Sequence, residues 1–294
     1  MPPPALVTRF APSPTGYLHR GHAFSALTAF AAARGAAHQG LDGRFILRLE
    51  DIDATRCRQE YEAALYEDLA WLGLDWEQPV RRQSEHMADY GAALRDLSER
   101  GLTYRCFRTR REVAQAIESA PHGAMETFRG EALPPDEEAR RIEAGEAYAW
   151  RLSLDAAARA LSLGNGGGFG ALTFIEHGEG PGGEHGVILA RPELGGDVVL
   201  ARKDVGVAYH LAVVVDDALQ GITQVIRGQD LFEATHVQRL LQALLALPTP
   251  AYRHHRLLAG PDGKRLAKRD QAQTLRELRA SGMTAAELRG DLGF

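Results

Sequence analysis

The chain has 294 residues, 45% hydrophobic and 25% charged, with a formal net charge of −5 and two cysteines. This length and composition indicate a globular protein of one large or two ordinary domains. Two thiols exclude a disulfide framework and a four-thiolate zinc site. No run approaches the roughly 20 apolar residues of a membrane span, and we see no secretory signal, so we expect a cytoplasmic protein without a membrane partner. The negative charge argues against non-specific coating of nucleic acid, although residues 105–111 and 264–269 form local basic clusters.

The first elements expected are a strand at residues 6–8, a turn punctuated by Pro and Gly, and a helix over residues 21–34. This order places His19 and His22 at a helix N-terminus. Backbone N–H groups there lack intrahelical partners and favour phosphate, and side chains three residues apart face the same way. The two histidines could merely cap and solvate the helix, but the Pro-Ser-Pro-Thr-Gly turn before them favours a phosphate site.

Residues 45–50 have the length and composition of a buried strand that ends in an acidic group. Residues 59–72 and 86–102 then repeat apolar positions at helical spacing. A strand followed by a helix, twice over, predicts an α/β fold with a parallel sheet. Ligands of such sheets bind beyond the carboxyl ends of the strands, where Ser13 and Glu50 would both lie. A structural salt bridge is an equally acceptable role for Glu50.

The middle of the chain differs in composition from the first hundred residues. Charged residues at 134–144 have helical spacing, residues 147–152 read as a short strand, and residues 164–186 are rich in glycine. The glycine-rich run could be a phosphate cradle or a flexible surface loop. We favour the loop, because no Gly-Lys-Ser/Thr follows and no strong strand precedes.

The parallel sheet is expected to resume after this run. Candidate strands lie at 197–200, 211–217 and 222–226, and a helix is expected over residues 235–247. We therefore predict a nucleotide-binding α/β fold interrupted by an α+β insertion. A cation-rich turn at the end, followed by helical residues 271–289, reads by itself as a solvated loop.

Several segments, taken in order, resemble motifs of the class I aminoacyl-tRNA synthetases. His19-Arg20-Gly21-His22 is similar to the first class signature, and Arg265-Leu266-Ala267-Lys268-Arg269 to the mobile lysine loop. Segments that resemble the glutamyl branch are Arg9-Phe10-Ala11-Pro12-Ser13-Pro14-Thr15-Gly16, Arg48-Leu49-Glu50-Asp51-Ile52-Asp53 and Tyr209-His210-Leu211-Ala212-Val213-Val214-Val215-Asp216-Asp217. An ordered set of motifs is far more specific than any one of them.

The resemblance implies a class I Rossmann-type parallel sheet. Its halves would be residues 1–104 and 203–248, separated by an acceptor-binding-like insertion at 105–202 and followed by the lysine loop and a short helical segment at 249–294. Only 25 residues follow the lysine loop, so we expect no anticodon-binding domain. The chain is thus most similar to the glutamyl-queuosine tRNA(Asp) synthetases, which attach glutamate to a modified base instead of the 3′ end.

The resemblance also implies roles. The expected glutamate-binding residues are Arg9, Phe10, Ala11, Pro12, Ser13, Glu50, Tyr209 and Arg227. Arginines would bind the side-chain carboxylate bidentately and Glu50 the ammonium. His19, His22 and Lys268 would act on ATP, which enters with Mg²⁺. The partners implied are L-glutamate and tRNA(Asp) carrying queuosine, and we expect a monomer.

Two departures from the family pattern matter. Members often bind zinc through Cys-x-Cys and a later Tyr and Cys, but here only Cys106 remains, so we expect no structural zinc. In the lysine loop, Arg265 and Ala267 stand where the family usually has Lys and Ser. Lys268 is retained, so we expect ATP activation with altered loop dynamics. Tyr17 and Arg20 are assigned no role.

Three other functions fit part of the sequence. A truncated synthetase could charge the 3′ adenosine of a tRNA, and a small-molecule adenylyltransferase could use the same histidine and lysine motifs. Such an adenylyltransferase has no need of a glutamate pocket. A non-catalytic RNA-binding paralogue is the third, and the retained histidines and Lys268 argue against it.

Overall fold

The computed structural model describes residues 5–118, 127–165, 167–203, 206–258 and 273–294. At its centre β1 (Ala5–Phe10), β2 (Asp42–Leu49) and β3 (Arg81–Arg82) form a parallel sheet in the order β1-β2-β3. Next to β1 lies a second parallel pair, β10 (Gln224–Gly228) and β11 (Ala251–His255). The Thr223 N–H donates to the Val7 carbonyl (3.0 Å) and links the two sets of strands. The predicted parallel α/β sheet is confirmed.

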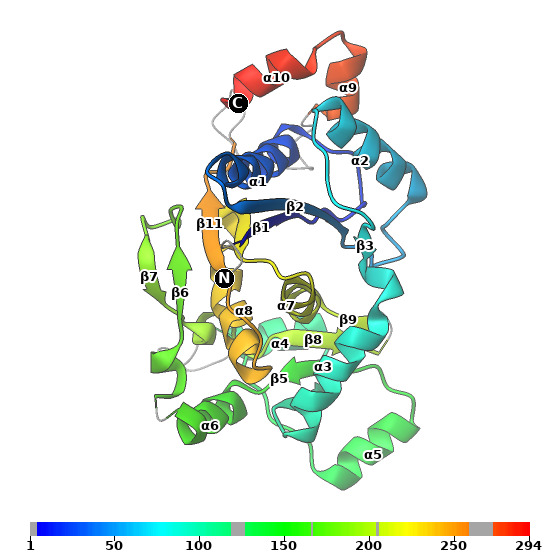
Figure 1. Cartoon of the computed structure of the whole chain (residues 1–294). Helices are drawn as coiled ribbons and strands as arrows, with labels where there is room; N and C mark the ends of the chain where they lie inside the picture. The colour runs from blue at the N-terminus through cyan, green and yellow to red at the C-terminus, as the bar shows by residue number, and fades with distance from the viewer. Residues whose placement is uncertain (1–4, 119–126, 166, 204–205, 259–272) are drawn as a thin grey trace.

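Helices cover both faces of this sheet (Figure 1). One face carries α1 (Arg20–His38), α2 (Gln59–Trp71), α9 (Leu275–Ala280) and α10 (Ala285–Leu292); the other carries α3 (Met87–Glu99), α7 (Tyr209–Leu219) and α8 (Phe232–Leu244). Strand side chains alternate between the two cores, as the period of a strand requires. Ile46 and Val225 point to the α7 side, whereas Leu47 and Ile226 point to the α1 side.

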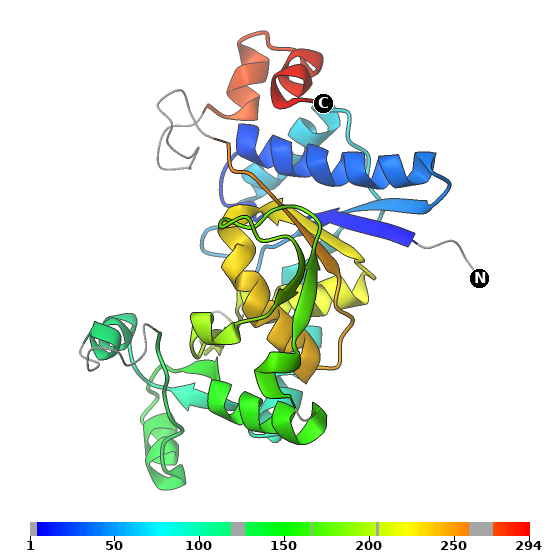
Figure 2. The same cartoon turned by 90° about the vertical axis from the view of Figure 1, so that its left-hand side faces the viewer.

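A smaller antiparallel sheet lies at the lower end of the molecule (Figures 1 and 2). Its strands are β4 (Thr103–Cys106), β5 (Ala149–Leu152), β8 (Val199–Arg202) and β9 (Gly206–Val207), paired in that order. Three helices surround it: α4 (Arg110–Glu118), α5 (Pro135–Glu143) and α6 (Leu154–Asn165). Short 3₁₀ turns occur at Gln83–Glu85, Gly168–Ala171, Pro192–Gly195 and Gln229–Leu231.

Three expectations from the sequence are wrong. The strand expected at 197–200 does not belong to the parallel sheet, because β8 pairs antiparallel with β5 and β9. Residues 211–217, expected as a strand, lie in α7, where every side chain from Leu211 to Asp217 is buried. A helix buried all round shows no 3.6-residue period, so its run of valines resembles a strand. The glycine-rich run, expected as a flexible loop, contains β6 (Thr173–Glu176), which pairs with β11 and with β7 (Gly186–Leu189). The C-terminal helical stretch is two helices, because α9 and α10 each begin at their own capping box.

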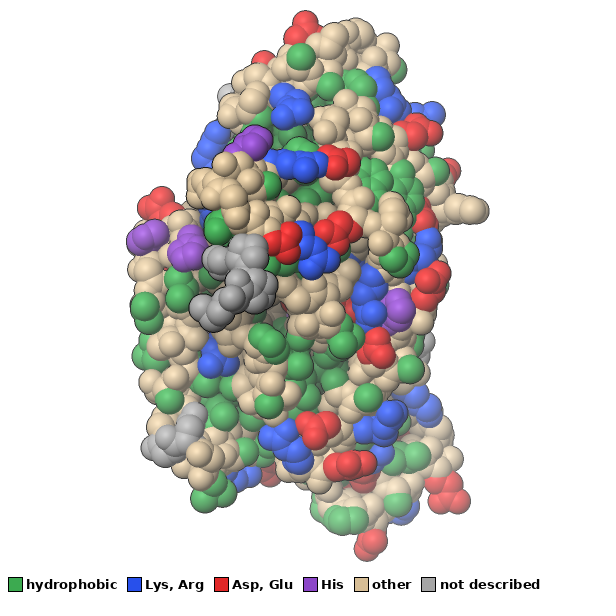
Figure 3. Space-filling model, viewed as in Figure 1, with side chains coloured by type: hydrophobic (Ala, Val, Ile, Leu, Met, Phe, Trp, Pro, Cys, Tyr) green, Lys and Arg blue, Asp and Glu red, His purple; other side chains and the backbone are tan. Residues whose placement is uncertain are grey.

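Acidic and basic side chains are interspersed over the face seen in Figure 3. They do not gather there into one extended basic patch, in line with the net charge of −5. Among the described residues, no helix combines the length and apolar character needed to cross a membrane.

Candidate active site

A cavity of about 590 Å³ opens at the carboxyl ends of β1 and β10. It brings together most of the residues that the sequence singled out. Arg9, Phe10, Ala11, Pro12, Ser13, His19, His22, Glu50, Tyr209 and Arg227 all line it. Lys268 and the motif at 265–269 lie outside the described residues. The placement at the ends of adjacent parallel strands is the one expected for a ligand site in an α/β sheet.

The turn after β1 is tied to its neighbours by backbone hydrogen bonds. The Pro12 carbonyl accepts from the Glu50 N–H (3.1 Å), and the Pro14 carbonyl accepts from the Arg58 N–H (3.1 Å). Within the turn, the Thr15 N–H donates to the Ser13 carbonyl (2.8 Å). Glu50 therefore lies beside Ser13, although the two are far apart in the chain.

His19 is the N-cap of α1, and the predicted place of both histidines at a helix start is confirmed. His19 Nδ1 accepts from the Gly21 N–H (3.1 Å), and His22 Nδ1 accepts from the His19 N–H (3.2 Å). A neutral imidazole that accepts at Nδ1 carries its proton on Nε2. The two rings, 3.9 Å apart between centroids, are thus set as Nε2–H donors at the positive end of a helix.

Gly21 is required by this arrangement. A Cβ at position 21 would lie 2.9 Å from His19 Cε1, closer than packed carbon atoms tolerate. A larger residue would push the His19 ring away from the helix N-terminus.

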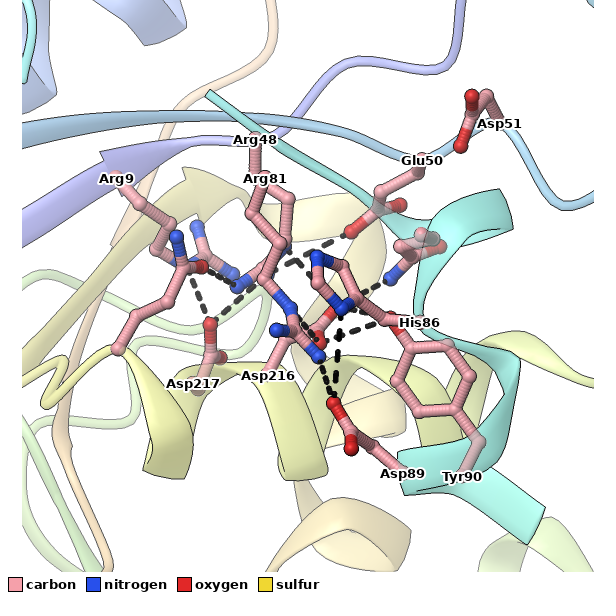
Figure 4. Close-up of polar contacts among 12 residues, drawn as sticks. Arg9, Arg48, Glu50, Asp51, Arg81, His86, Asp89, Tyr90, Asp216 and Asp217 are labelled. Carbon is pink, nitrogen blue, oxygen red and sulfur yellow. Dashed lines mark hydrogen bonds and ion pairs between the residues drawn. The ribbon is translucent and has the colours of Figure 1, made fainter. Parts of the chain in front are cut away.

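A network of buried charges fills the Arg9 end of the cavity (Figure 4). Asp217, on α7, lies 3.2 Å from Arg9 Nε and 2.9 Å from Arg48 Nη2. Arg48 is wholly buried and also lies 3.7 Å from Glu50 Oε1. The Arg9 Nη1 atom donates to the Ile226 carbonyl (3.4 Å). Each arginine at this end therefore has a carboxylate partner within the protein.

Asp216 extends the same network away from the cavity. Its carboxylate accepts from Arg81 Nε (2.7 Å), Gln83 Nε2 (2.8 Å) and the Tyr90 hydroxyl (2.9 Å). Burial, together with the Asp216 carboxylate, raises the pKa of Tyr90 well above its usual value. These contacts fix α7 against the strand ends and so hold Asp217 in place.

Glu50 sits between this network and the cavity. Burial raises its pKa from 4.5 to about 7, and the carboxylates of Asp217 and Asp216 add to the rise, which Arg48 and Arg9 oppose. A cation placed in the cavity beside Glu50 would favour the ionised carboxylate. The residue is thus suited to receive an ammonium group.

The Arg227 end of the cavity is different. Arg227 donates to the Tyr209 hydroxyl (3.3 Å), to Thr235 Oγ1 (2.7 Å) and to His254 Nε2 (3.2 Å). All three partners are neutral, and within the described residues no carboxylate forms an ion pair with Arg227. A buried guanidinium without a counter-ion is a site for an anionic ligand group.

Behind Arg227 lies a hydrogen-bonded pair, Glu176 and His254, that the sequence did not predict. Glu176 accepts from His254 Nδ1 (2.6 Å) and from the His254 backbone N–H (2.8 Å), and both side chains are fully buried. Burial lowers the pKa of His254, so the ring is neutral with Nε2 as the acceptor for Arg227. Burial raises the pKa of Glu176, but hydrogen bonds from His254 outweigh it, so Glu176 stays ionised with a pKa below its usual value. Nothing in the glycine-rich sequence around Glu176 signals this role.

The residues around Cys106 do not fit a zinc ion. Cys106 is buried in a small apolar cluster with Tyr104 and Phe128. The Tyr104 hydroxyl and the Gly130 N–H both donate to Asp197 (2.9 Å each), so side-chain packing and hydrogen bonds occupy this place. No group of three or more metal-binding side chains disposed around one point occurs in the described part of the chain.

Comparison with known proteins decides the family. Residues 5–162 and 184–289 match the family described as tRNA synthetases class I (E and Q), catalytic domain. The chain belongs to this family.

Curated relatives narrow the assignment. The Glutamyl-Q tRNA(Asp) synthetase of Rhodobacter capsulatus is 45% identical over 98% of this chain and 100% of its own length. The protein of the same name from Symbiobacterium thermophilum is 41% identical over 98% of this chain and 86% of its own length. Glutamate–tRNA ligase 2 of Acidithiobacillus ferrooxidans is also 41% identical, but the match covers 57% of its length. The resemblance to glutamyl-queuosine tRNA(Asp) synthetases is thereby confirmed.

Solved structures agree in fold. A glutamate tRNA ligase from Elizabethkingia meningosepticum, in complex with its amino acid, superimposes with a TM-score of 0.70 at 25% identity. The match covers 95% of this chain and 53% of that one, so the chain spans about half the length of this solved ligase. A methionyl-tRNA synthetase from Mycobacterium tuberculosis matches with a TM-score of 0.59 at 13% identity, which shows the shared fold alone. The predicted class I synthetase fold is confirmed.

Proposed function

We propose that this protein activates L-glutamate with ATP and transfers the glutamyl group to queuosine in tRNA(Asp). One observation carries the proposal: a single cavity holds a buried guanidinium, Arg227, that has no counter-ion among the described residues, and a carboxylate, Glu50. Glutamate offers a side-chain carboxylate to the first and an ammonium to the second. The full-length similarity to Glutamyl-Q tRNA(Asp) synthetases supports the choice of acceptor.

In the first step, an oxygen of the α-carboxylate attacks the α-phosphorus of ATP. The bond between that phosphorus and the bridging oxygen breaks, and pyrophosphate leaves with the electron pair. Because the attacking carboxylate is already a nucleophile, the protein needs no covalent intermediate and acts by positioning and charge stabilisation. Arg227, Tyr209 and Arg9 would hold the side chain of glutamate, and Glu50 its ammonium.

ATP enters as its Mg²⁺ complex, in which the metal would help to neutralise the phosphate charge. His19 and His22 would donate from Nε2 to phosphate oxygens as negative charge develops. The N-terminus of α1 adds its positive dipole at the same place. Lys268 would neutralise the departing pyrophosphate.

In the second step, a queuosine hydroxyl attacks the carbonyl carbon of glutamyl-adenylate. A C–O ester bond forms, the bond from that carbon to the phosphate oxygen breaks, and AMP leaves with the electron pair. The hydroxyl proton passes to the departing phosphate or to solvent. Glutamine is rejected because a neutral amide would leave the buried arginine underpaired, at a cost of about 1–3 kcal/mol or more.

The proposal also covers the domain organisation of the chain. We divide the chain into catalytic halves at 1–104 and 203–248, an insertion at 105–202 and a C-terminal segment at 249–294. The separate sheet of β4, β5, β8 and β9 supports the insertion, whereas β6 and β7 attach to the catalytic sheet through β11. We further propose a cytoplasmic monomer, for which light scattering should give 32.1 kDa.

One experiment tests the function. The protein is incubated with ATP, radiolabelled glutamate and tRNA(Asp) prepared with and without queuosine. Label that appears on RNA only when queuosine is present supports the proposal. Label on the 3′ end of tRNA(Glu) would instead assign a truncated glutamate ligase. Exchange of pyrophosphate without any RNA acceptance would assign a small-molecule adenylyltransferase.

A further inference from the structure

A second cavity, of about 460 Å³, adjoins the first. The two share Ser13, Glu50 and Tyr209 in their linings. The rest of the second lining comes from β8 and the start of α4, in the insertion, from β9 and the first turn of α7, and from the catalytic half at residues 52–56 and Gln83. This second cavity therefore lies between the catalytic sheet and the insertion, on the far side of Glu50 from the histidines of α1.

Three arginines line the second cavity. Arg56 is paired with Asp53 (2.6 Å). Arg110, at the start of α4, is exposed, and Arg202, at the end of β8, is half-buried. Neither Arg110 nor Arg202 forms an ion pair with any residue that the structure describes. Two cations at the rim of a cavity, without counter-ions in the part of the chain that the structure describes, suit an anionic polymer.

His210 supplies the polar group inside. It is the second residue of α7, and its ring lies edge-on to Tyr209 with centroids 5.5 Å apart. Its Nδ1 atom is closed off from solvent and has no hydrogen-bond partner among the described residues. Burial, with the nearby charge of Arg227, lowers the pKa of His210 to about 4, so the ring is neutral at physiological pH. Because Nδ1 is closed off, a ligand in the cavity would meet the ring at Nε2, and a neutral imidazole nitrogen can either donate to or accept from a hydroxyl group.

We propose that the second cavity binds the acceptor nucleoside, with His210 hydrogen-bonded to a hydroxyl of the base and Arg110 and Arg202 on the phosphates beside it. This inference rests on the proposed function and adds the place of its second substrate. If Glu50 holds the ammonium of the glutamyl group, the reacting carbonyl lies close to the wall that the two cavities share. A hydroxyl at His210 would then approach the carbonyl of glutamyl-adenylate from the second cavity, away from the AMP group beside the histidines of α1.

Separate measurement of the two half-reactions tests the role of His210. Glutamate-dependent ATP–pyrophosphate exchange needs only the first cavity, whereas transfer to queuosine-containing tRNA(Asp) needs both. In His210→Ala we expect kcat/KM for the tRNA to fall at least tenfold, because one buried hydrogen bond is lost, while exchange falls less than threefold. His210→Gln, which keeps a donor and an acceptor, should restore a large part of transfer. His38→Ala, on the exposed end of α1, is the matched control and should leave both reactions unchanged.

Salt dependence tests the two arginines. For a single strand, each lost phosphate contact reduces the slope of log kcat/KM against log salt by about 0.7. Arg110→Ala and Arg202→Ala should each show this reduction in transfer. Arg95→Ala, on α3 and outside both cavities, should keep the wild-type slope.

The outcomes separate this inference from the proposed function. If wild-type protein never labels queuosine-containing tRNA(Asp), the proposed function fails. If wild-type protein labels it and His210→Ala does so equally well, the proposed function holds and the second-cavity inference is overturned. A parallel loss of exchange in folded His210→Ala, with wild-type melting temperature, would also overturn it, because His210 would then belong to the glutamate or ATP site.

Discussion

Arg9 and Arg227 lie at two ends of one cavity, and each is 5% exposed. Arg9 pairs with Asp217, whereas Arg227 contacts a phenol, a hydroxyl and a neutral imidazole. Burial of a charge costs several kcal/mol unless an opposite charge compensates it. Asp217 supplies that compensation for Arg9, whereas no carboxylate among the described residues supplies it for Arg227, which leaves this role to a ligand. Two arginines of equal burial therefore differ: Arg9 reaches the glutamate site as part of a preassembled ion-pair framework, and Arg227 provides the cation there that has no described counter-ion.

The substitutions Arg227→Met and Arg9→Met test the difference between the two arginines most directly. Loss of Arg227 removes the charge partner of the substrate carboxylate, worth about 3–5 kcal/mol, so kcat/KM for glutamate in ATP–pyrophosphate exchange should fall more than a hundredfold. No described carboxylate depends on Arg227 and its substitution removes a buried charge without a described counter-ion, so the free energy of unfolding of the ligand-free protein should not fall.

Arg9→Met should lose both activity and stability. Asp217 would keep Arg48 but lose one of its two partners, which costs about 1–3 kcal/mol in urea unfolding. Arg9→Ala should likewise abolish glutamate activation, and wild-type exchange in that variant would remove Arg9 from the glutamate site. Equal stability losses in the two Met variants would contradict the distinction drawn between the arginines.

Glu50 lies between the two ends of the cavity, and its ionisation should make glutamate binding depend on pH. Its pKa of about 7 in the empty site means that the carboxyl is neutral below that pH and cannot hold an ammonium. The kcat/KM for glutamate, which reports the free enzyme, should fall about tenfold per pH unit below pH 7. Glu50→Gln should give a low and flat profile. A wild-type profile that stays level down to pH 5 would exclude Glu50 as the ammonium partner.

The raised pKa of Glu50 should also make the stability of the protein depend on pH. The folded-state pKa of Glu50 lies above its unfolded value of 4.5, so its contribution to stability is complete below that pH and is lost as pH rises to about 7. The free energy of unfolding of Glu50→Gln, relative to wild type, should therefore rise by about 2–3 kcal/mol between pH 4.5 and pH 8. Urea unfolding at the two pH values checks the sign.

Glu176 should act on Arg227 only through His254. In Glu176→Gln, a neutral amide no longer holds the His254 proton on Nδ1. His254 Nε2 is then no longer fixed as the acceptor for Arg227, and the guanidinium is no longer held in its position in the cavity. We expect KM for glutamate to rise about tenfold with kcat within a factor of two, because the site is displaced and the chemistry is not. Glu179→Gln, on the exposed neighbouring position, is the control. A fall in kcat at unchanged KM would exclude this positioning role.

Much of the fold could be predicted because β1, α1 and β2 have the composition of their elements and α2 repeats apolar positions at helical spacing. The place of His19, His22, Ser13 and Glu50 followed from the ends of those elements. Helix α7 was mistaken for a strand because it is buried on all sides. Strand β6 was missed because glycines surround it.

The charge pairing could not be predicted. Arg9 and Asp217 are 208 positions apart, and Glu176 and His254 are 78 apart, so no local pattern records these contacts. The sequence therefore predicted two similar arginines for the glutamate side chain, and only the fold shows that one of them is already paired.

Tyr209→Phe should give the smallest change in activity. It tests how much the neutral partners of Arg227 contribute to glutamate binding. The Tyr209 hydroxyl accepts a 3.3 Å hydrogen bond from Arg227, which is long, and its loss removes one neutral contact. We expect kcat/KM for glutamate in exchange to fall about threefold, with an unchanged free energy of unfolding. Because the substrate carboxylate, not the phenol, compensates Arg227, this loss must stay far below that of Arg227→Met. A hundredfold loss in Tyr209→Phe would mean that the phenol itself binds the substrate anion, and Arg227 would then have the supporting role.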